Sequence, residues 1–72
     1  MQGQKNMSQR ELHYIEDGLK AEQLTIKKYQ MFGNQTSDPE VSEICMNLAN
    51  KHLQHYNTLL QHLQSNSQTS VQ

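Results

Sequence analysis

Three side chains of this chain, Glu22, His52 and His55, are of the types that bind metal ions in proteins. His52 and His55 lie three positions apart, so in a helix their imidazoles project from the same face at nearly the same depth. Glu22 interrupts an otherwise apolar series, where an unpaired carboxylate would cost several kcal/mol. A glutamate with two imidazoles is a reasonable ligand set for zinc, or for iron if a second subunit adds oxygen donors. The sequence therefore predicts a candidate metal site at these three residues.

Two other interpretations of Glu22 need no metal. A hydrogen bond between its carboxylate and an imidazole would satisfy both groups and fix the register of two helices. A shift in that register would instead turn Glu22 towards solvent. His62 is two turns beyond His55, about 10 Å along the helix axis, so it cannot share the same metal ion. We expect His62 and His13 to be solvated.

Residues 8–32 are predicted to form the first helix. Ser8 and Glu11 match the capping box, in which each side chain bonds to the backbone N–H of the other residue. Apolar side chains then recur at steps of three and four on one seam, at Leu12, Ile15, Leu19, Ile26 and Tyr29. Gly18 costs about 1 kcal/mol relative to alanine in a helix, which a closely packed second helix would explain. Gly33 is the expected C-terminal stop, with residues 33–37 forming the turn.

Residues 38–63 are predicted to form the second helix. Its start, Asp38-Pro39-Glu40, combines a favoured cap, a proline tolerated in the first turn and an acid that complements the helix dipole. Its seam consists of Val41, Cys45, Leu48, His52, His55, Leu59 and His62. Residues 1–7 and 64–72 have no apolar period, so we expect a flexible N-terminal arm and a disordered C-terminal tail.

The short turn predicts an all-α fold, an antiparallel two-helix hairpin. When positions of the two helices are paired outward from the turn, Glu22 lies level with position 49, within one turn of His52. The same pairing places Glu16 level with His55. Each apolar stripe is wider than one neighbouring helix can cover. A core of this size seldom supplies more than about 3–5 kcal/mol. We therefore expect a homodimer in which two hairpins form a four-helix bundle.

Charge and composition exclude several kinds of partner. The net charge is −1 and the basic residues alternate with acids, which argues against a nucleic-acid partner. From Ile44 onward Lys51 is the only formal charge, and this amide-rich helix is compatible with lateral packing. No apolar run indicates a signal peptide or a membrane span, and Cys45 is expected to be a small buried hydrophobe. A cytoplasmic location, without secretion by a signal peptide, fits these features.

Evidence for an enzyme is weak. Glycine-rich phosphate loops, G-x-S-x-G turns and H-E-x-x-H motifs are absent from the sequence. Cys45 is two turns from His52, which weakens any cysteine–histidine nucleophile. Tyr14, Tyr29 and Tyr56 are interpreted as core or boundary aromatics. The expectation is that the protein is not an enzyme.

The ligand set resembles that of the ferritin-like bundles, in which one helix gives a glutamate and the next a Glu-x-x-His motif. Glu22 resembles the first, and His52-Leu53-Gln54-His55 resembles the second. His52 stands where that family has a bridging glutamate, so the resemblance does not extend to a di-iron oxidase centre.

A nearer resemblance is to small coat-F-like spore coat proteins, a ferritin-like branch, over about residues 8–63. The matching features are Gly18-Leu19-Lys20-Ala21-Glu22, Tyr29 before the turn, Asp38-Pro39-Glu40 after it and residues 52–60. This resemblance implies a structural role in the spore coat, with other coat proteins as partners. Two functions are thus expected: a structural, self-assembling module or, alternatively, a zinc- or iron-binding four-helix bundle.

Overall fold

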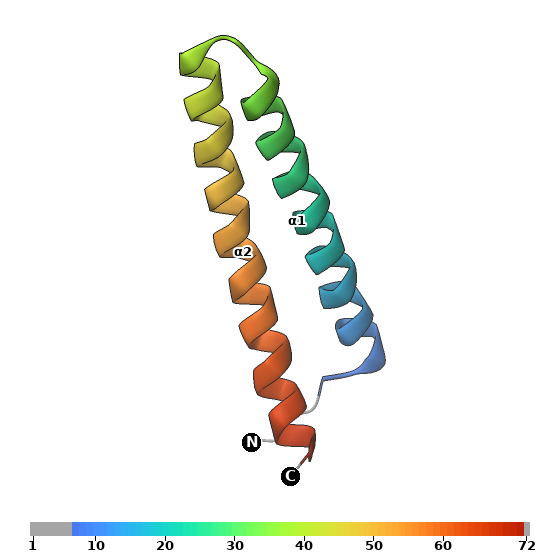
Figure 1. The fold of residues 1–72 in the computed structure, drawn as a ribbon. Helices are drawn as coiled ribbons and strands as arrows, with labels where there is room; N and C mark the ends of the chain where they lie inside the picture. Colours follow the sequence, from blue (N-terminus) through green and yellow to red (C-terminus); the bar gives the residue numbers. More distant parts are fainter. Residues whose placement is uncertain (1–6, 72) are drawn as a thin grey trace.

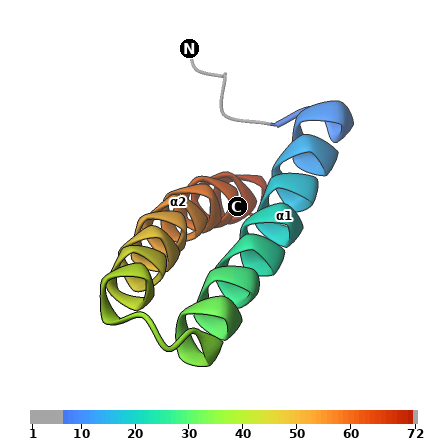
Figure 2. The same cartoon turned by 90° about the horizontal axis from the view of Figure 1, so that it is seen from above.

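The protein is an antiparallel hairpin of two long helices. The computed structural model describes residues 7–71, with side chains as far as Ser65. Helix α1 spans Gln9–Gln35 and helix α2 spans Pro39–Val71. The two helices lie side by side and are joined at one end by a short turn (Figure 1), and the view from above shows the same pairing (Figure 2). The all-α hairpin predicted from the sequence is confirmed.

Both helix starts are formed by the predicted caps. The backbone N–H of Glu11 donates to Ser8 Oγ at 3.1 Å, and the N–H of Ser8 donates to Glu11 Oε1 at 3.0 Å. Asp38 Oδ1 accepts from the backbone N–H groups of Glu40 at 2.9 Å and Val41 at 3.3 Å. These bonds satisfy N–H groups that have no partner within the helix, so each helix begins at a defined residue.

Gly33 does not end the first helix, as was expected. It is a buried position inside α1, and no glycine among the described residues has a positive φ. A Cβ at Gly33 would lie 3.2 Å from Cys45 Cβ and 3.4 Å from the backbone oxygen of Ser42. The Ser42 hydroxyl also donates to the Gly33 carbonyl oxygen at 2.8 Å. Gly33 therefore serves the close approach of the helices, and the turn is residues 36–38 in place of 33–37.

Because the turn lies further along the chain than predicted, the pairing of residues between the two helices also differs from the prediction. Glu22 contacts both His52 and His55, and Gly18 lies against Leu59. The expected pairing of Glu16 with His55 is therefore wrong, and the register differs from the predicted one by between one and two helical turns. Moving the centre of the turn towards the C-terminus shifts the whole of α2 relative to α1.

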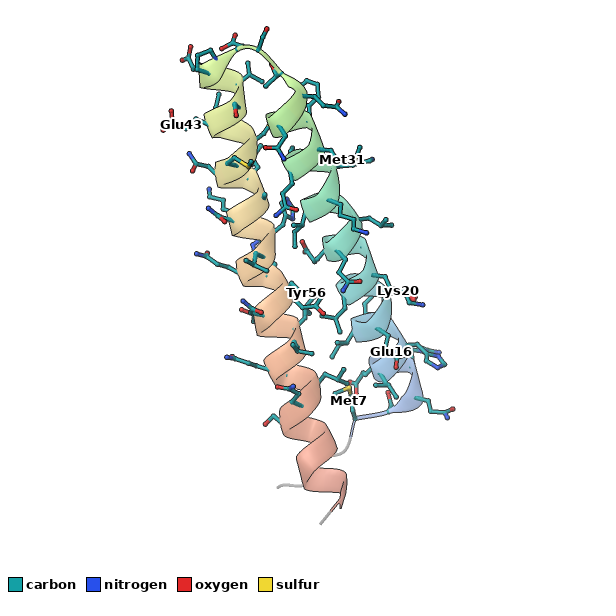
Figure 3. The ribbon with its side chains drawn as sticks, viewed as in Figure 1. Met7, Glu16, Lys20, Met31, Glu43 and Tyr56 are labelled. Atoms are coloured by element: carbon teal, nitrogen blue, oxygen red, sulfur yellow. The ribbon has the colours of Figure 1, made fainter. Side chains whose placement is uncertain are left out.

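Helix α2 continues past its predicted end at 63, so the tail expected to be disordered over 64–72 is helical as far as Val71. The sequence has neither glycine nor proline after Pro39, and its many glutamines and leucines favour helix. Of the predicted N-terminal arm, only Met7 lies within the described residues; residues 1–6 lie outside them. Met7 points into the space between the two helices (Figure 3).

The core between the helices is small. Gly33, Cys45 and Ala49 are the only buried positions among the residues whose side chains are described. Most of the predicted seam is only half-buried. Burial of Cys45 confirms its expected role, whereas Tyr14 is 80% exposed and is not a core aromatic. Within the described part of the chain, neither helix has an apolar stretch long enough to span a bilayer.

The two central glycines are expected to respond oppositely to alanine. Gly33→Ala forces a Cβ against the Ser42 backbone and Cys45 Cβ, so overpacking should outweigh the gain in helix propensity and destabilise by about 1–2 kcal/mol. At Gly18 the new Cβ meets only Leu59 Cδ1, at 3.3 Å, and this flexible side chain can move. Gly18→Ala should therefore be neutral or stabilising by up to about 1 kcal/mol. Thermal unfolding followed by circular dichroism checks both, and equal destabilisation by the two changes would contradict the packing described here.

Candidate functional site

The three predicted ligand residues meet at the middle of the hairpin. Glu22 projects from α1 between the two histidines of α2. Glu22 Oε1 lies 2.6 Å from His52 Nδ1, and Oε2 lies 3.6 Å from His55 Nδ1. One ligand atom from each residue falls within a group no wider than 4.8 Å. The contact of Glu22 with His52 is a hydrogen bond whenever Nδ1 carries a proton, and an ion pair when the imidazole is charged.

Aromatic packing fixes the orientation of His52. The Tyr29 ring stacks on the His52 ring with centroids 5.8 Å apart and planes inclined by 23°. His55 meets His52 edge-on at 5.4 Å. Tyr29 follows Glu22 by seven residues, two turns of α1, so both reach the same side of the helix. The sequence analysis placed Tyr29 on the seam but did not connect it with His52, because that contact depends on the register.

Solvent reaches the cluster from one side. The side chains of Glu22 and His52 are 21% and 29% exposed, whereas that of His55 is 61% exposed. The carboxylate thus retains partial hydration as well as its imidazole partners, which keeps the cost of placing it between the helices low. The interpretation in which Glu22 faces solvent is wrong.

The spacing of the three groups suits a tetrahedral ion. Zinc bonds of roughly 2.1 Å at tetrahedral angles place neighbouring ligand atoms about 3.4 Å apart. The distance from His55 Nδ1 to Glu22 Oε2, 3.6 Å, is near that separation, and the distance from His52 Nδ1 to Glu22 Oε1, 2.6 Å, is shorter by less than 1 Å. One ligand atom from each residue lies within 4.8 Å of the others, so small side-chain movements would be needed to share one ion. Three protein ligands would leave a fourth coordination position of such an ion for water.

Other candidate residues lie outside this cluster. The metal-competent group formed by the described side chains includes neither His62 nor His13. Both of these residues are exposed. Cys45 is a free, buried thiol that packs against Gly33. It does not belong to the Glu22–His52–His55 cluster.

A second feature is an apolar groove on one side of the hairpin, here named the central groove. Its volume is about 610 Å³, and it is lined by Lys20, Gln23, Leu24, Ile26, Lys27, Leu53 and Tyr56. Gln23 Nε2 donates to Tyr56 Oη at 3.3 Å and so links the two helices beside the groove. Figure 3 shows Tyr56 between the helices and Lys20 on the outer flank of α1. Sequence analysis predicted uncovered apolar surface but not this groove.

Comparison with protein-family models, with curated proteins and with solved structures found no match for this chain.

Proposed function

We propose that this chain is a structural, self-assembling module in which two hairpins associate into a four-helix bundle. One observation carries the proposal: large apolar side chains are left in water while the core stays small. Cys45 and Ala49 are the only buried apolar side chains among those described. The exposed large ones are Tyr14, Leu24, Met31, Phe32, Ile44 and Leu53, with exposed fractions from 44% to 80%.

The energies favour association over a lone hairpin. Burying one leucine or isoleucine side chain contributes about 1.5–3 kcal/mol, so covering two or three of the exposed ones is worth as much as a small core supplies alone. Salt bridges do not offset the small apolar core, because among the described residues the ion pairs between α1 and α2 are those of Glu22 with His52 and His55. Folding is therefore coupled to pairing, and a homodimer is the simplest closed assembly.

Dilution tests this coupling. For a dimer that folds as it assembles, stability should fall by about 1.4 kcal/mol for each tenfold dilution, and the melting temperature should fall with it. Circular dichroism melts over a hundredfold range of concentration measure the effect. A melting temperature independent of concentration would contradict coupled folding and assembly.

The biological setting follows from the resemblance to coat-F-like proteins. We propose a structural role of the spore-coat type, in the cytoplasm or the coat, with coat proteins as further partners and without catalysis. The long amide-rich α2, which carries only Lys51 as a formal charge after Ile44, supports lateral packing.

Metal binding is a second candidate function, supported by the Glu22–His52–His55 geometry. Zinc fits the nitrogen-rich ligand set better than iron, which would need more oxygen donors than the hairpin offers here. Without a metal, the same contacts pair α1 with α2 and fix their register. The zinc experiment in the Discussion separates the two roles.

A further inference from the structure

The buried positions of the hairpin all lie on one side of the candidate metal site. Gly33, Cys45 and Ala49 are the buried positions among the residues whose side chains are described, and they lie between this site and the turn. On the other side the hairpin consists of residues 9–21 of α1 and 56–71 of α2, which we name the free-end half. Figure 1 shows this half running from the middle of the hairpin to the end opposite the turn. The closest packing of the helices therefore ends at about the level of the metal site.

The free-end half is held by apolar contacts that are incompletely shielded from water. Among its residues with described side chains, 9–21 and 56–65, none is buried. Gly18 lies against Leu59 there, and both are half-buried. The other half-buried apolar side chains of this half are Leu12, Ile15, Leu19, Tyr56, Leu60 and Leu63. Regions with few buried contacts open more readily than the rest of a protein, so we expect this half to separate before the half beside the turn.

Separation of the helices would also cost α1 its helical structure in this half. Helices shorter than about 12–15 residues are only marginally stable in water on their own, and residues 9–21 are a segment of that length. Without α2 beside them, these residues lose their helical hydrogen bonds, and their backbone N–H groups exchange with solvent. Hydrogen exchange therefore measures how often the free-end half opens.

The candidate metal site lies at the boundary between the two halves and takes ligands from both helices. Glu22 comes from α1, 2.6 Å from His52 Nδ1 and 3.6 Å from His55 Nδ1 of α2. An ion bound by all three residues joins the helices at this level, so a separation that reaches Glu22 has to release the ion. Because the ion binds only the closed form, zinc at a hundred times its Kd lowers the population of the open form about a hundredfold.

We infer that Glu22, His52 and His55 form a metal-dependent clasp, and that zinc bound there closes the free-end half of the hairpin. This inference rests on the metal-binding candidate proposed above and adds its consequence for the chain. The ion controls whether α1 and α2 stay paired beyond the last buried positions.

Hydrogen exchange followed by mass spectrometry tests the clasp. The starting state is protein without a histidine tag, treated with a chelator and kept at one concentration throughout. In this metal-free state the backbone amides of residues 13–21 should exchange faster than those of residues 45–50, which include the buried Cys45 and Ala49. Zinc sulfate at a hundred times its Kd, measured on the same sample by isothermal titration calorimetry, should slow exchange in residues 13–21 by up to about a hundredfold.

Glu22→Gln is the variant that separates a clasp from zinc binding to α2 alone. It removes the ligand on α1, whereas His52 and His55 remain three positions apart on α2. Zinc should therefore no longer slow exchange in residues 13–21. Asp17→Asn is the matched control, because it removes a carboxylate from an exposed position of α1 outside the metal site, and it should preserve the slowing.

Three results would overturn the clasp. Zinc that binds without slowing exchange in residues 13–21, or that slows it equally in Glu22→Gln, would leave metal binding standing without a clasp. Metal-free exchange as slow in residues 13–21 as in residues 45–50 would show that the free-end half does not open first. No heat of zinc binding to the unaltered chain would overturn both the clasp and the metal-binding candidate.

Discussion

Ala49→Asp is expected to unfold the hairpin. Ala49 is 3% exposed, so an ionised carboxylate there loses most of its water. That loss costs several kcal/mol, as much as a small core supplies in total. The helical circular dichroism signal at micromolar concentration should fall to that of a largely unfolded chain.

The neighbouring residue provides the control for this change. Asn50→Asp introduces the same charge one position later, at an exposed site on the same helix. It should change the melting temperature by no more than a few degrees, in keeping with a surface effect of about 0.5 kcal/mol. If Ala49→Asp kept its helical signal and a cooperative melt, the two helices would not be packed at Ala49 as described.

Zinc is expected to stabilise the chain through Glu22, His52 and His55. At a free zinc concentration a hundred times Kd, binding to the folded state alone contributes about 2.7 kcal/mol. For a domain of this size that corresponds to a rise of roughly 10–20 °C in melting temperature. Protein without a histidine tag, first treated with a chelator, should be used.

Two variants separate zinc binding from a metal-free contact. His55→Ala should abolish the zinc-dependent rise and change the metal-free stability little, because His55 is 61% exposed. His13→Ala removes an exposed histidine outside the cluster and should preserve the full rise. An unaltered chain whose melting temperature is the same with and without zinc would leave the cluster a structural contact that sets the register.

Local sequence signals predicted the helix starts, and the proximity of Glu22 to His52, correctly. Ser8 with Glu11, and Asp38 before Pro39, act within one turn of chain, so their hydrogen bonds follow from residue type and spacing alone. Glu22 and His52 were also expected to be close, since the estimated register placed them within one turn of each other. These predictions hold even when the position of the turn is wrong by a few residues.

The register and the end of α2 were less predictable. Gly33 has two possible uses, as a stop in a left-handed conformation or as a site of close helix contact. Only the packing of Cys45 and Ser42 against it decides for the second. Because Gly33 lies inside α1, the turn comes later in the chain. The neighbour of His55 is therefore Glu22 and not Glu16, and Tyr29 stacks on His52. Polarity alone suggested a disordered tail, whereas the absence of glycine and proline allows α2 to continue to Val71.

The central claim, that the hairpin completes its core with a second copy, is tested most directly by sedimentation equilibrium of the unaltered, metal-free protein at micromolar concentration. The predicted result is a mass twice the 8.4 kDa of the chain, decreasing on dilution together with the helical signal. A mass of one chain at every concentration, with the helical signal fully retained, would contradict it.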